Sequence, residues 1–209
     1  AWTTTPWTLP SNLALAVGYD IDYAVVDLDG VRYVIAESLL GSYSAELGEA
    51  TVVETRKGSD FVGRRYRPLF DYFAETERFG TAEAFQVLGA DFVSTEDGTG
   101  IVHLAPGFGE DDQLAANAAG IPTICPMDEH GRYTAEITDW AGTHVFDANP
   151  LVIRAPKESG GVVRHATYAD SWPHCWRCAQ PLVYRAISSW FVQVTAIRDR
   201  MVELNQEIN

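Results

Sequence analysis

Short strand-like runs separated by turn signals constrain the fold of this chain more than any other feature. These apolar or alternating runs cover residues 13–17, 23–28, 31–36, 51–55, 84–93, 100–104, 161–168 and 182–194. Asp29-Gly30 predicts a tight hairpin, and helical spacing is confined to 37–47, 110–119 and 195–208. Because the strands do not alternate regularly with helices, the sequence predicts a β-rich α+β fold, with a closed or strongly bent β-barrel core and peripheral helices.

The charge is spread unevenly along the 209 residues. Fifteen Lys and Arg face 29 Asp and Glu, a net charge of −14. Residues 1–153 hold 8 basic and 24 acidic side chains, whereas residues 154–209 hold 7 and 5. Surfaces that bind nucleic acid are usually basic, so composition alone argues against one here. With three cysteines, no signal segment and no membrane-length apolar run, we expect a cytoplasmic protein without a membrane partner.

A threonine run opens the chain. Residues 3–12 read TTTPWTLPSN, with Thr3, Thr4 and Thr5 directly before the first proline. Proline removes a backbone donor and favours extended chain, so these hydroxyls can face a ligand or a water molecule. Trp7 offers a flat surface for a base or ribose. An edge strand whose hydroxyls meet only solvent is an equally good interpretation of the pattern.

A second motif covers residues 98–112, GTGIVHLAPGFGEDD. One glycine-rich turn enters a strand that carries His103, and another opens an acidic helix; glycine allows a ligand to approach the backbone closely. The acids suit a helix N-terminus but would repel a phosphate, so an ammonium group is the better ligand for Asp112. His103 alone is also compatible with a purely structural role. No catalytic triad stands out, so a hydrolase of this sequence would use positioned water.

A third motif is the pair Cys175 and Cys178, which follows His174. Two cysteines in this spacing can bind zinc, but a closed structural site needs four ligands. The pair is therefore half of a zinc site, a redox pair or two plain thiols, and we favour the half zinc site. Cys125 is distant in sequence and flanked by apolar residues, which predicts a buried thiol.

These motifs together resemble the inserted editing domain of isoleucyl-tRNA synthetases. The resemblance rests on residues 3–12, 98–112 and 189–192 (SWFV), with 68–73 (PLFDYF) in support, and it runs from one end of the chain to the other. The His103 motif is shared with the valyl and leucyl enzymes. Those relatives usually carry arginine where this chain has Thr5, so the threonine run favours the isoleucyl branch.

The resemblance implies a proofreading hydrolase that removes valine from mischarged tRNA(Ile), with valyl-adenylate as a second candidate substrate. Its partners would be the 3′ end of aminoacylated tRNA(Ile) and the remainder of the parent synthetase, and the fragment would be monomeric. Editing would need no cofactor. The alternatives are a non-catalytic zinc-ribbon binding module and an editing domain of the valyl or leucyl branch.

The resemblance also implies residue roles. The α-ammonium of the substrate would bind to Asp112, whereas Glu110 and Asp111 would begin the helix. The hydroxyls of Thr3, Thr4 and Thr5 would hold the substrate and the attacking water. Thr8 and His103 would form the steric gate against isoleucine. Trp7 and Phe108 would flank the terminal adenosine or aminoacyl group.

The domain organisation follows from the same resemblance. We expect an editing core over 1–160, a zinc-ribbon-like return segment over 161–187, and the start of the return into the synthetic domain over 188–209. In many relatives a second cysteine pair lies just before the residue that matches Ala1. The chain therefore reads as a piece of a larger enzyme, and zinc would be bound only in the full-length parent.

Overall fold

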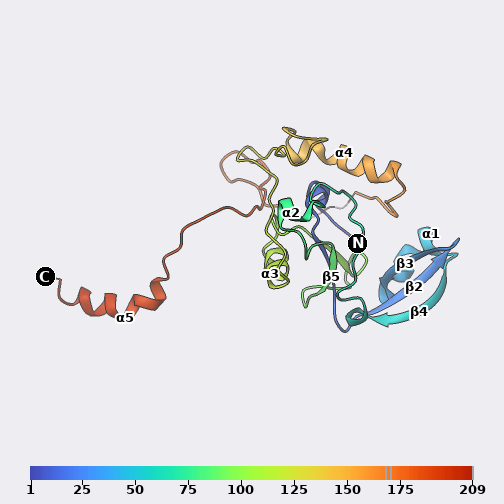
Figure 1. Ribbon diagram of the computed structural model, residues 1–209, viewed down its shortest axis with the longest axis horizontal. Helices are drawn as coiled ribbons and strands as arrows, with labels where there is room; N and C mark the ends of the chain where they lie inside the picture. Colours follow the sequence, from blue (N-terminus) through green and yellow to red (C-terminus); the bar gives the residue numbers. More distant parts are fainter. Residues whose placement is uncertain (168, 170, 209) are drawn as a thin grey trace.

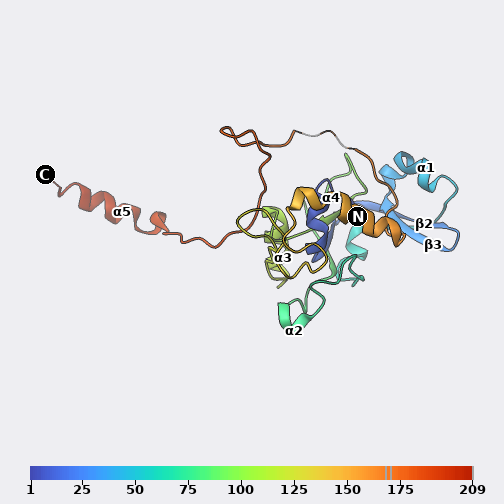
Figure 2. The same cartoon turned by 90° about the horizontal axis from the view of Figure 1, so that it is seen from above.

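The computed structural model describes residues 1–167, 169 and 171–208. Its strands form two three-stranded sheets, ordered β5-β1-β6 and β3-β2-β4 (Figure 1). The strands are β1 (Ala14–Val17), β2 (Asp22–Leu28), β3 (Val31–Ala36), β4 (Thr51–Lys57), β5 (Gln86–Gly89) and β6 (Ile101–Leu104). The β3-β2-β4 sheet lies at one end of the molecule in both Figures 1 and 2.

The predicted closed barrel is wrong, because both sheets are open. In the part of the chain that the structure describes, the outer strands β5 and β6 of one sheet and β3 and β4 of the other pair with no further strand. The strands of the first sheet are only four residues long, and irregular chain separates β4 from β5. Such short strands leave too little ladder for a sheet to close on itself.

The first sheet brings distant parts of the sequence together. Its central strand, β1, runs parallel to β5 and antiparallel to β6, so that Leu15 lies opposite both Val87 and His103. Just before β1, the proline-flanked segment forms the 3-10 helix η1 (Pro6–Ser11) rather than the expected extended chain. Amides of Thr8 and Asn12 close its turns. This 3-10 helix lets the threonines before it and the strand β1 after it both lie beside β6.

The second sheet confirms the predicted hairpin between β2 and β3. Asp29 and Gly30 have φ values of 54° and 82°, the backbone of the tight turn that matches strand twist. Buried side chains of this sheet form a hydrophobic cluster of their own with η2 (Glu37–Tyr43) and α1 (Ser44–Leu47). The predicted helix at 37–47 is thus a 3-10 helix followed by a single α-helical turn.

A larger hydrophobic cluster joins η1, the first sheet and two helices. α3 (Glu110–Ala118) confirms the helix predicted at 110–119. α4 (Val145–Glu158) packs on η1 and was not predicted, because Pro150 and Pro156 interrupt its sequence. The shorter elements are η3 (Gly58–Asp60) and α2 (Thr76–Phe79).

The C-terminal part of the chain differs most from expectation. No strand forms in the described residues of 161–168 or in 182–194, and Tyr168 lies outside the described residues. Trp190 and Phe191 are almost fully exposed. β-propensity alone does not make a strand without a partner. The predicted final helix does form, as α5 (Val194–Asn205), but it buries no residue and stands away from the rest of the molecule in Figures 1 and 2.

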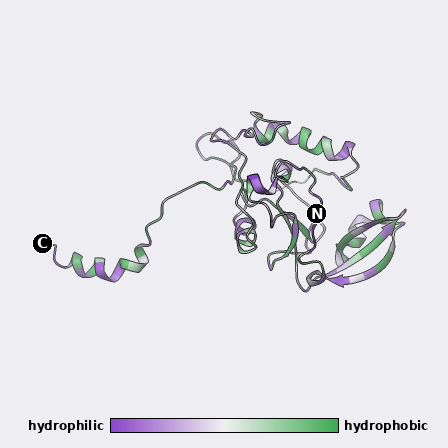
Figure 3. Cartoon of the chain, in the orientation of Figure 1, coloured by the Kyte–Doolittle hydropathy of each residue, from purple (hydrophilic) through white to green (hydrophobic). Residues whose placement is uncertain are grey.

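α5 carries hydrophilic and hydrophobic residues along its length without a packing partner (Figure 3). Among the described residues, no helix is both long and apolar enough to cross a membrane. The domain boundaries at 160/161 and 187/188 remain predictions.

Candidate functional site

A cavity of about 280 Å³ opens where the threonine run, β6 and the start of α3 meet. All eight residues to which the sequence analysis gave substrate or catalytic roles line it. The full lining is Trp2, Thr3, Thr4, Thr5, Trp7, Thr8, Val102, His103, Ala105, Phe108, Gly109, Asp112, Trp172 and Tyr184. Trp7, Thr8, His103 and Ala105 are buried, whereas Thr4 and Tyr184 are exposed, so the cavity has a closed floor and an accessible rim.

Hydrogen bonds connect the threonine hydroxyls on one wall. The Oγ1 atoms of Thr3 and Thr5 are 3.3 Å apart, and those of Thr5 and Thr8 are 3.1 Å apart. Thr8 donates its own hydrogen to the carbonyl oxygen of Thr5 at 2.7 Å. Among the described residues, the hydroxyl of Thr4 makes no hydrogen bond, which leaves it available to a ligand or a water molecule.

His103 closes the floor of the cavity beside Thr8. Its Nε2 lies 2.9 Å from the Oγ1 of Thr8, and its Nδ1 lies 2.8 Å from the Nδ2 of Asn12. Burial, and to a smaller extent the charge of the N-terminal amine of Ala1, together lower the pKa of His103 to about 3. The imidazole is therefore neutral near pH 7.

Asp112 faces the cavity from the first turn of α3. Its Oδ2 accepts a hydrogen bond from the amide of Ala105 at 2.8 Å. Burial raises the pKa of Asp112, the Ala105 amide lowers it, and the nearby charge of Asp111 raises it. A Cβ at Gly109 would lie 2.9 Å from the carboxyl carbon of Asp112, so a side chain there would displace this carboxyl group. Among the described residues no cationic side chain pairs with this partly buried carboxylate, which therefore suits an ammonium ligand.

Trp7, which lines one side of the cavity, is also part of the hydrophobic core. Trp7 packs edge to face against Phe146 of α4 and against Trp172, with ring centroids 4.9 and 5.6 Å apart. The hydroxyl of Tyr133 fixes its backbone by donating to its carbonyl oxygen at 2.5 Å. The ring of Trp7 is therefore held rigidly at the side of the cavity.

Trp172 and Tyr184 also line the cavity, although no sequence motif predicted a site role for either. Tyr184 lies in the run 182–194, whose pattern predicted only a strand. The structure holds Tyr184 at the rim through its neighbours: Arg185 donates to the carbonyl oxygen of Asp128 at 2.9 Å, and the amide of Ala186 donates to that of Gly107 at 2.8 Å. Lone aromatic residues in an irregular segment gave no periodic signal that could have identified them.

The cysteine pair lies in a tight loop that follows Trp172. The amide of Cys175 donates to the carbonyl oxygen of Gln180, and the amide of Ala179 donates back to Cys175, both at 2.8 Å. Hydrogen bonds from the amides of Cys178 and Arg177 lower the pKa of the Cys175 thiol. No group of three or more metal-ligating side chains occurs among the described residues. The half zinc site at Cys175 and Cys178 therefore stays a prediction.

A second cavity, of about 420 Å³, lies between α2 and residues 135–138. It is lined by charged side chains such as Asp71, Glu75 and Arg78 and by none of the predicted site residues. The 280 Å³ cavity is the better candidate, because hydroxyl, imidazole and carboxyl groups converge there beside aromatic side chains.

Comparison with known proteins identifies close relatives, although no family model matches the chain. The chain is 52% identical over 216 residues to the isoleucine–tRNA ligase of Mycobacterium tuberculosis, an alignment that covers 99% of this chain and 20% of the relative. For the isoleucine–tRNA ligase of Rickettsia felis the identity is 52% over 211 residues, covering 100% of this chain and 19% of the relative. For that of Treponema denticola it is 49% over 221 residues, covering 100% and 20%.

The chain thus spans about a fifth of the length of these curated relatives. Its fold resembles the crystal structure of GlLeuRS-CP1 with a TM-score of 0.58 at 17% sequence identity, over 80% of this chain and 83% of that one. The fold likeness and the sequence identity agree with the resemblance found from the motifs. The chain belongs to the isoleucine–tRNA ligase family and corresponds to the inserted editing-domain region of those enzymes.

Proposed function

We propose that the 280 Å³ cavity hydrolyses the ester that joins valine to tRNA(Ile), and that valyl-adenylate is a second substrate. The observation that carries this proposal is the pairing of a free hydroxyl, on Thr4, with a carboxyl group, on Asp112, across one small cavity. The 52% identity to isoleucine–tRNA ligases supports it. One methylene gives only about 1–3 kcal/mol of discrimination, a limit for which these ligases are the standard example, so a second hydrolytic site serves them.

The chemistry follows from these groups. The carboxylate of Asp112 would hold the α-ammonium of the aminoacyl group by a charge-assisted hydrogen bond. Thr4 would orient a water molecule toward the ester carbonyl, while Thr3 and Thr5 keep their hydroxyls fixed by hydrogen bonds. Water oxygen bonds to the carbonyl carbon, the bond to the ribose oxygen breaks, and that oxygen takes up a proton. The products are valine and free tRNA.

Size selection would come from the floor. Thr8 and His103 are buried there and hydrogen-bonded to each other, so neither can move aside cheaply. A valyl side chain would fit above them, whereas the extra methylene of an isoleucyl side chain would overlap them. The cognate product would therefore escape hydrolysis.

Replacing Asp112 by asparagine tests the proposal, because the amide can still accept from the Ala105 amide but carries no charge. In the full-length ligase, Asp112→Asn is expected to lower kcat/KM for deacylation of valyl-tRNA(Ile) by about ten- to a hundredfold, the value of one charge-assisted hydrogen bond. Asp111→Asn, an exposed neighbour on the same turn, is the matched control. Equal rates for Asp112→Asn and Asp111→Asn would refute the assigned role.

We further propose that Cys175 and Cys178 bind zinc only together with two ligands from outside this chain. The support is the lowered pKa of Cys175 and the tight loop around it. Metal analysis of the full-length ligase should then find one zinc fewer in Cys175→Ser than in the unaltered enzyme. Equal zinc content would show that the pair is not a ligand pair.

A further inference from the structure

Tyr184 lies at the mouth of the 280 Å³ cavity with a ring that the fold does not use. The residue is 65% exposed, and among the described residues its hydroxyl makes no hydrogen bond and its ring meets no other aromatic ring. The rings of Trp7, Phe108 and Trp172 also line the cavity, but all three pack in the larger hydrophobic cluster. Tyr184 therefore presents the cavity with an aromatic face that is not already covered.

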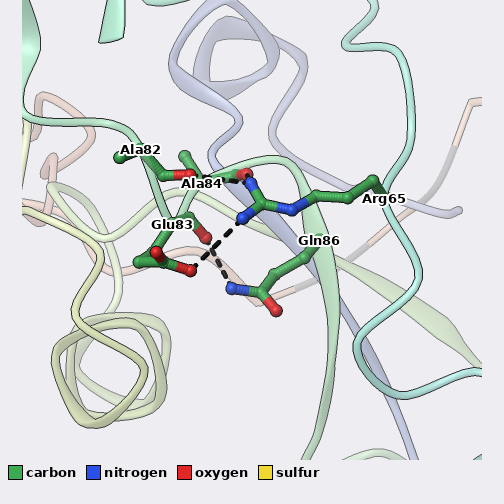
Figure 4. A network of polar contacts seen from close by, with 5 residues as sticks. All are labelled: Arg65, Ala82, Glu83, Ala84 and Gln86. Carbon is green, nitrogen blue, oxygen red and sulfur yellow. Dashed lines mark hydrogen bonds and ion pairs between the residues drawn. The ribbon is translucent and has the colours of Figure 1, made fainter. Parts of the chain in front are cut away.

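An exposed side chain can owe its position to the contacts that it makes, as Arg65 shows elsewhere on the surface. Its side chain is 53% exposed, yet its guanidinium donates to the carbonyl oxygens of Ala82 and Ala84 at 2.8 and 2.7 Å and to the carboxylate of Glu83 at 3.2 Å (Figure 4). The side chain of Tyr184 makes no such bond within the described part of the chain. The fold therefore does not account for an aromatic residue at the cavity mouth.

The backbone on both sides of Tyr184 is fixed. Before it, Leu182 is held twice: its amide donates to the carbonyl oxygen of Pro173 at 2.9 Å, and its own carbonyl oxygen accepts from the indole of Trp172 at 2.8 Å. After it, the next two residues make the bonds to the backbone of 127–128 and to the turn between β6 and α3 described above. A ring on a fixed backbone has little freedom left to lose when a ligand binds, so it is preorganised for contact.

The proposed substrate defines which of its own parts can reach this ring. Its ammonium group would lie on Asp112 and its ester beside Thr4, with the amino-acid side chain on the buried floor. Thr4 and Tyr184 are the two exposed residues of the lining. Because the ribose is bonded to the ester oxygen, the terminal nucleoside must extend from Thr4 over the open rim, where Tyr184 is the exposed ring.

We propose that Tyr184 is a substrate-binding residue, whose ring stacks on the base of the terminal nucleotide when the aminoacyl group occupies the cavity. A base stacks on an aromatic side chain without the help of positive charge, which suits a chain of net charge −14 that is poorly equipped for phosphate contacts. The assignment adds Tyr184 to Trp7 and Phe108, the flanks expected from the sequence. It rests on the proposed function of the cavity, which supplies the nucleoside.

Two non-hydrolysable analogues, bound to this 209-residue chain, separate the base from the rest of the substrate. One is valine in amide linkage to 3′-amino-3′-deoxyadenosine, and the other is the same amide on a methyl riboside that lacks the base. We expect Tyr184→Ala to raise the Kd of the adenosine analogue by about tenfold, the scale of one base–aromatic contact. The Kd of the riboside analogue should not change. NMR titration measures both constants.

Two further variants control for the ring and for its place. Tyr184→Phe keeps the aromatic face and loses only the hydroxyl, so both Kd values should equal those of the unaltered chain. Trp176→Ala removes an 87% exposed ring from the loop of the cysteine pair, which does not line the cavity, and it should also change neither value.

The base itself reports the stacking in the same titration. In the complex with the unaltered chain, the ring current of Tyr184 should shift the H2 and H8 signals of the adenine upfield. Tyr184→Leu keeps an apolar side chain without a ring, so the upfield shift should be smaller in its complex. An equal shift in both complexes would place the base away from Tyr184.

Four binding results would overturn the proposal. Tyr184→Ala could leave the Kd of the adenosine analogue unchanged, or raise the Kd of both analogues equally. Tyr184→Phe could weaken binding as much as Tyr184→Ala does. The unaltered chain could bind the adenosine analogue no more tightly than the riboside analogue, in which case the base adds no affinity.

Hydrolysis of valyl-tRNA(Ile) by the unaltered full-length ligase separates failure of this inference from failure of the proposed function. If the ligase hydrolyses this substrate, any of the four results refutes the stacking on Tyr184 alone. If it does not, the proposed function fails, and the role of Tyr184 fails with it.

Discussion

Thr8 shows how individual residues combine packing and polarity in this site. It is 4% exposed, and its hydroxyl contacts both Thr5 and His103. A residue buried this deeply with all its hydrogen bonds made is rigid. Rigidity is what a steric gate needs, because rejection of one methylene depends on a floor that does not yield.

Thr8→Ala is expected to enlarge the floor and admit the isoleucyl group. Hydrolysis of isoleucyl-tRNA(Ile) by the full-length ligase should rise by about tenfold or more, the scale of one methylene of discrimination. Thr81→Ala is the matched control, because Thr81 is equally buried and its hydroxyl bonds only to the carbonyl oxygen of Phe73. Both variants lose a buried hydrogen bond. If both gained hydrolysis of isoleucyl-tRNA(Ile), a loosened core would explain the gain, and Thr8 would not be the steric gate.

The titration of His103 predicts a pH dependence of stability. Its pKa falls from the usual 6.5 to about 3 in the folded chain, so the unfolded chain binds more protons between these values. The contribution of a neutral His103 to the free energy of unfolding is fully present above about pH 6.5. It is lost as the pH falls, by up to about 1.4 kcal/mol per pH unit. Asp112, whose pKa is raised, opposes this trend by favouring the folded state at low pH.

Urea unfolding of unaltered chain and of His103→Gln, compared between about pH 7 and pH 5, measures this effect. Over that range, the free energy of unfolding should fall more for the unaltered chain than for His103→Gln. The difference between their slopes against pH should correspond to nearly one proton. Equal slopes would mean that His103 takes up a proton in the folded chain and is not held neutral.

At the scale of elements, the turn between β6 and α3 brings the carboxylate of Asp112 into the cavity that the threonine run also lines. Gly107 makes this turn possible: a Cβ there would lie 2.2 Å from the carbonyl oxygen of Ile124 and 2.7 Å from the Cα of Cys125. Both contacts are with backbone atoms, which cannot rotate away. The turn and the 124–125 segment must therefore separate if a side chain is added.

Gly107→Ala should accordingly destabilise the chain by about 3 kcal/mol, at the upper end for an overpacked core, and lower Tm by about 6–12 °C. Gly41→Ala is the control, because nothing lies within 4 Å of a Cβ at that position and its φ is not positive. Thermal unfolding followed by circular dichroism checks both. A Tm for Gly107→Ala equal to that of Gly41→Ala would show that the two segments are not packed as described.

The sequence predicted local elements better than their assembly. The Asp29-Gly30 hairpin and α3 follow from turn and capping signals that act within a few residues. The barrel and the strand at 182–194 failed because pairing depends on partners far along the chain. α4 escaped prediction because its prolines suggested a break.

The site residues were anticipated where they belong to dense motifs. Thr3, Thr8, His103 and Asp112 lie in the threonine run or the glycine-rich motif, and the structure brings both motifs to one cavity. Trp172 and Tyr184 had no such signal, because their place beside the cavity depends on the packing of a segment far from both motifs in sequence. Relations of that kind become visible only in the folded chain.

At the scale of the whole molecule, the net charge of −14 bears on what the chain can hold. An acidic surface is unsuited to binding the body of a tRNA. It is compatible with our proposal that the cavity takes only the aminoacylated 3′ end, in which the carboxylate of Asp112 would bind an ammonium group rather than a phosphate. The chain spans about a fifth of its relatives, which leaves the tRNA body to the rest of the enzyme in our proposal.

A structure of this chain with a non-hydrolysable valyl-adenosine analogue would show whether the 280 Å³ cavity is the hydrolytic site. We expect the analogue in that cavity, with its ammonium group on Asp112, its ester mimic beside Thr4 and its valyl side chain on Thr8 and His103. Binding in the 420 Å³ cavity beside Asp71 and Arg78, or binding to the first cavity with the ammonium group away from Asp112, would contradict it.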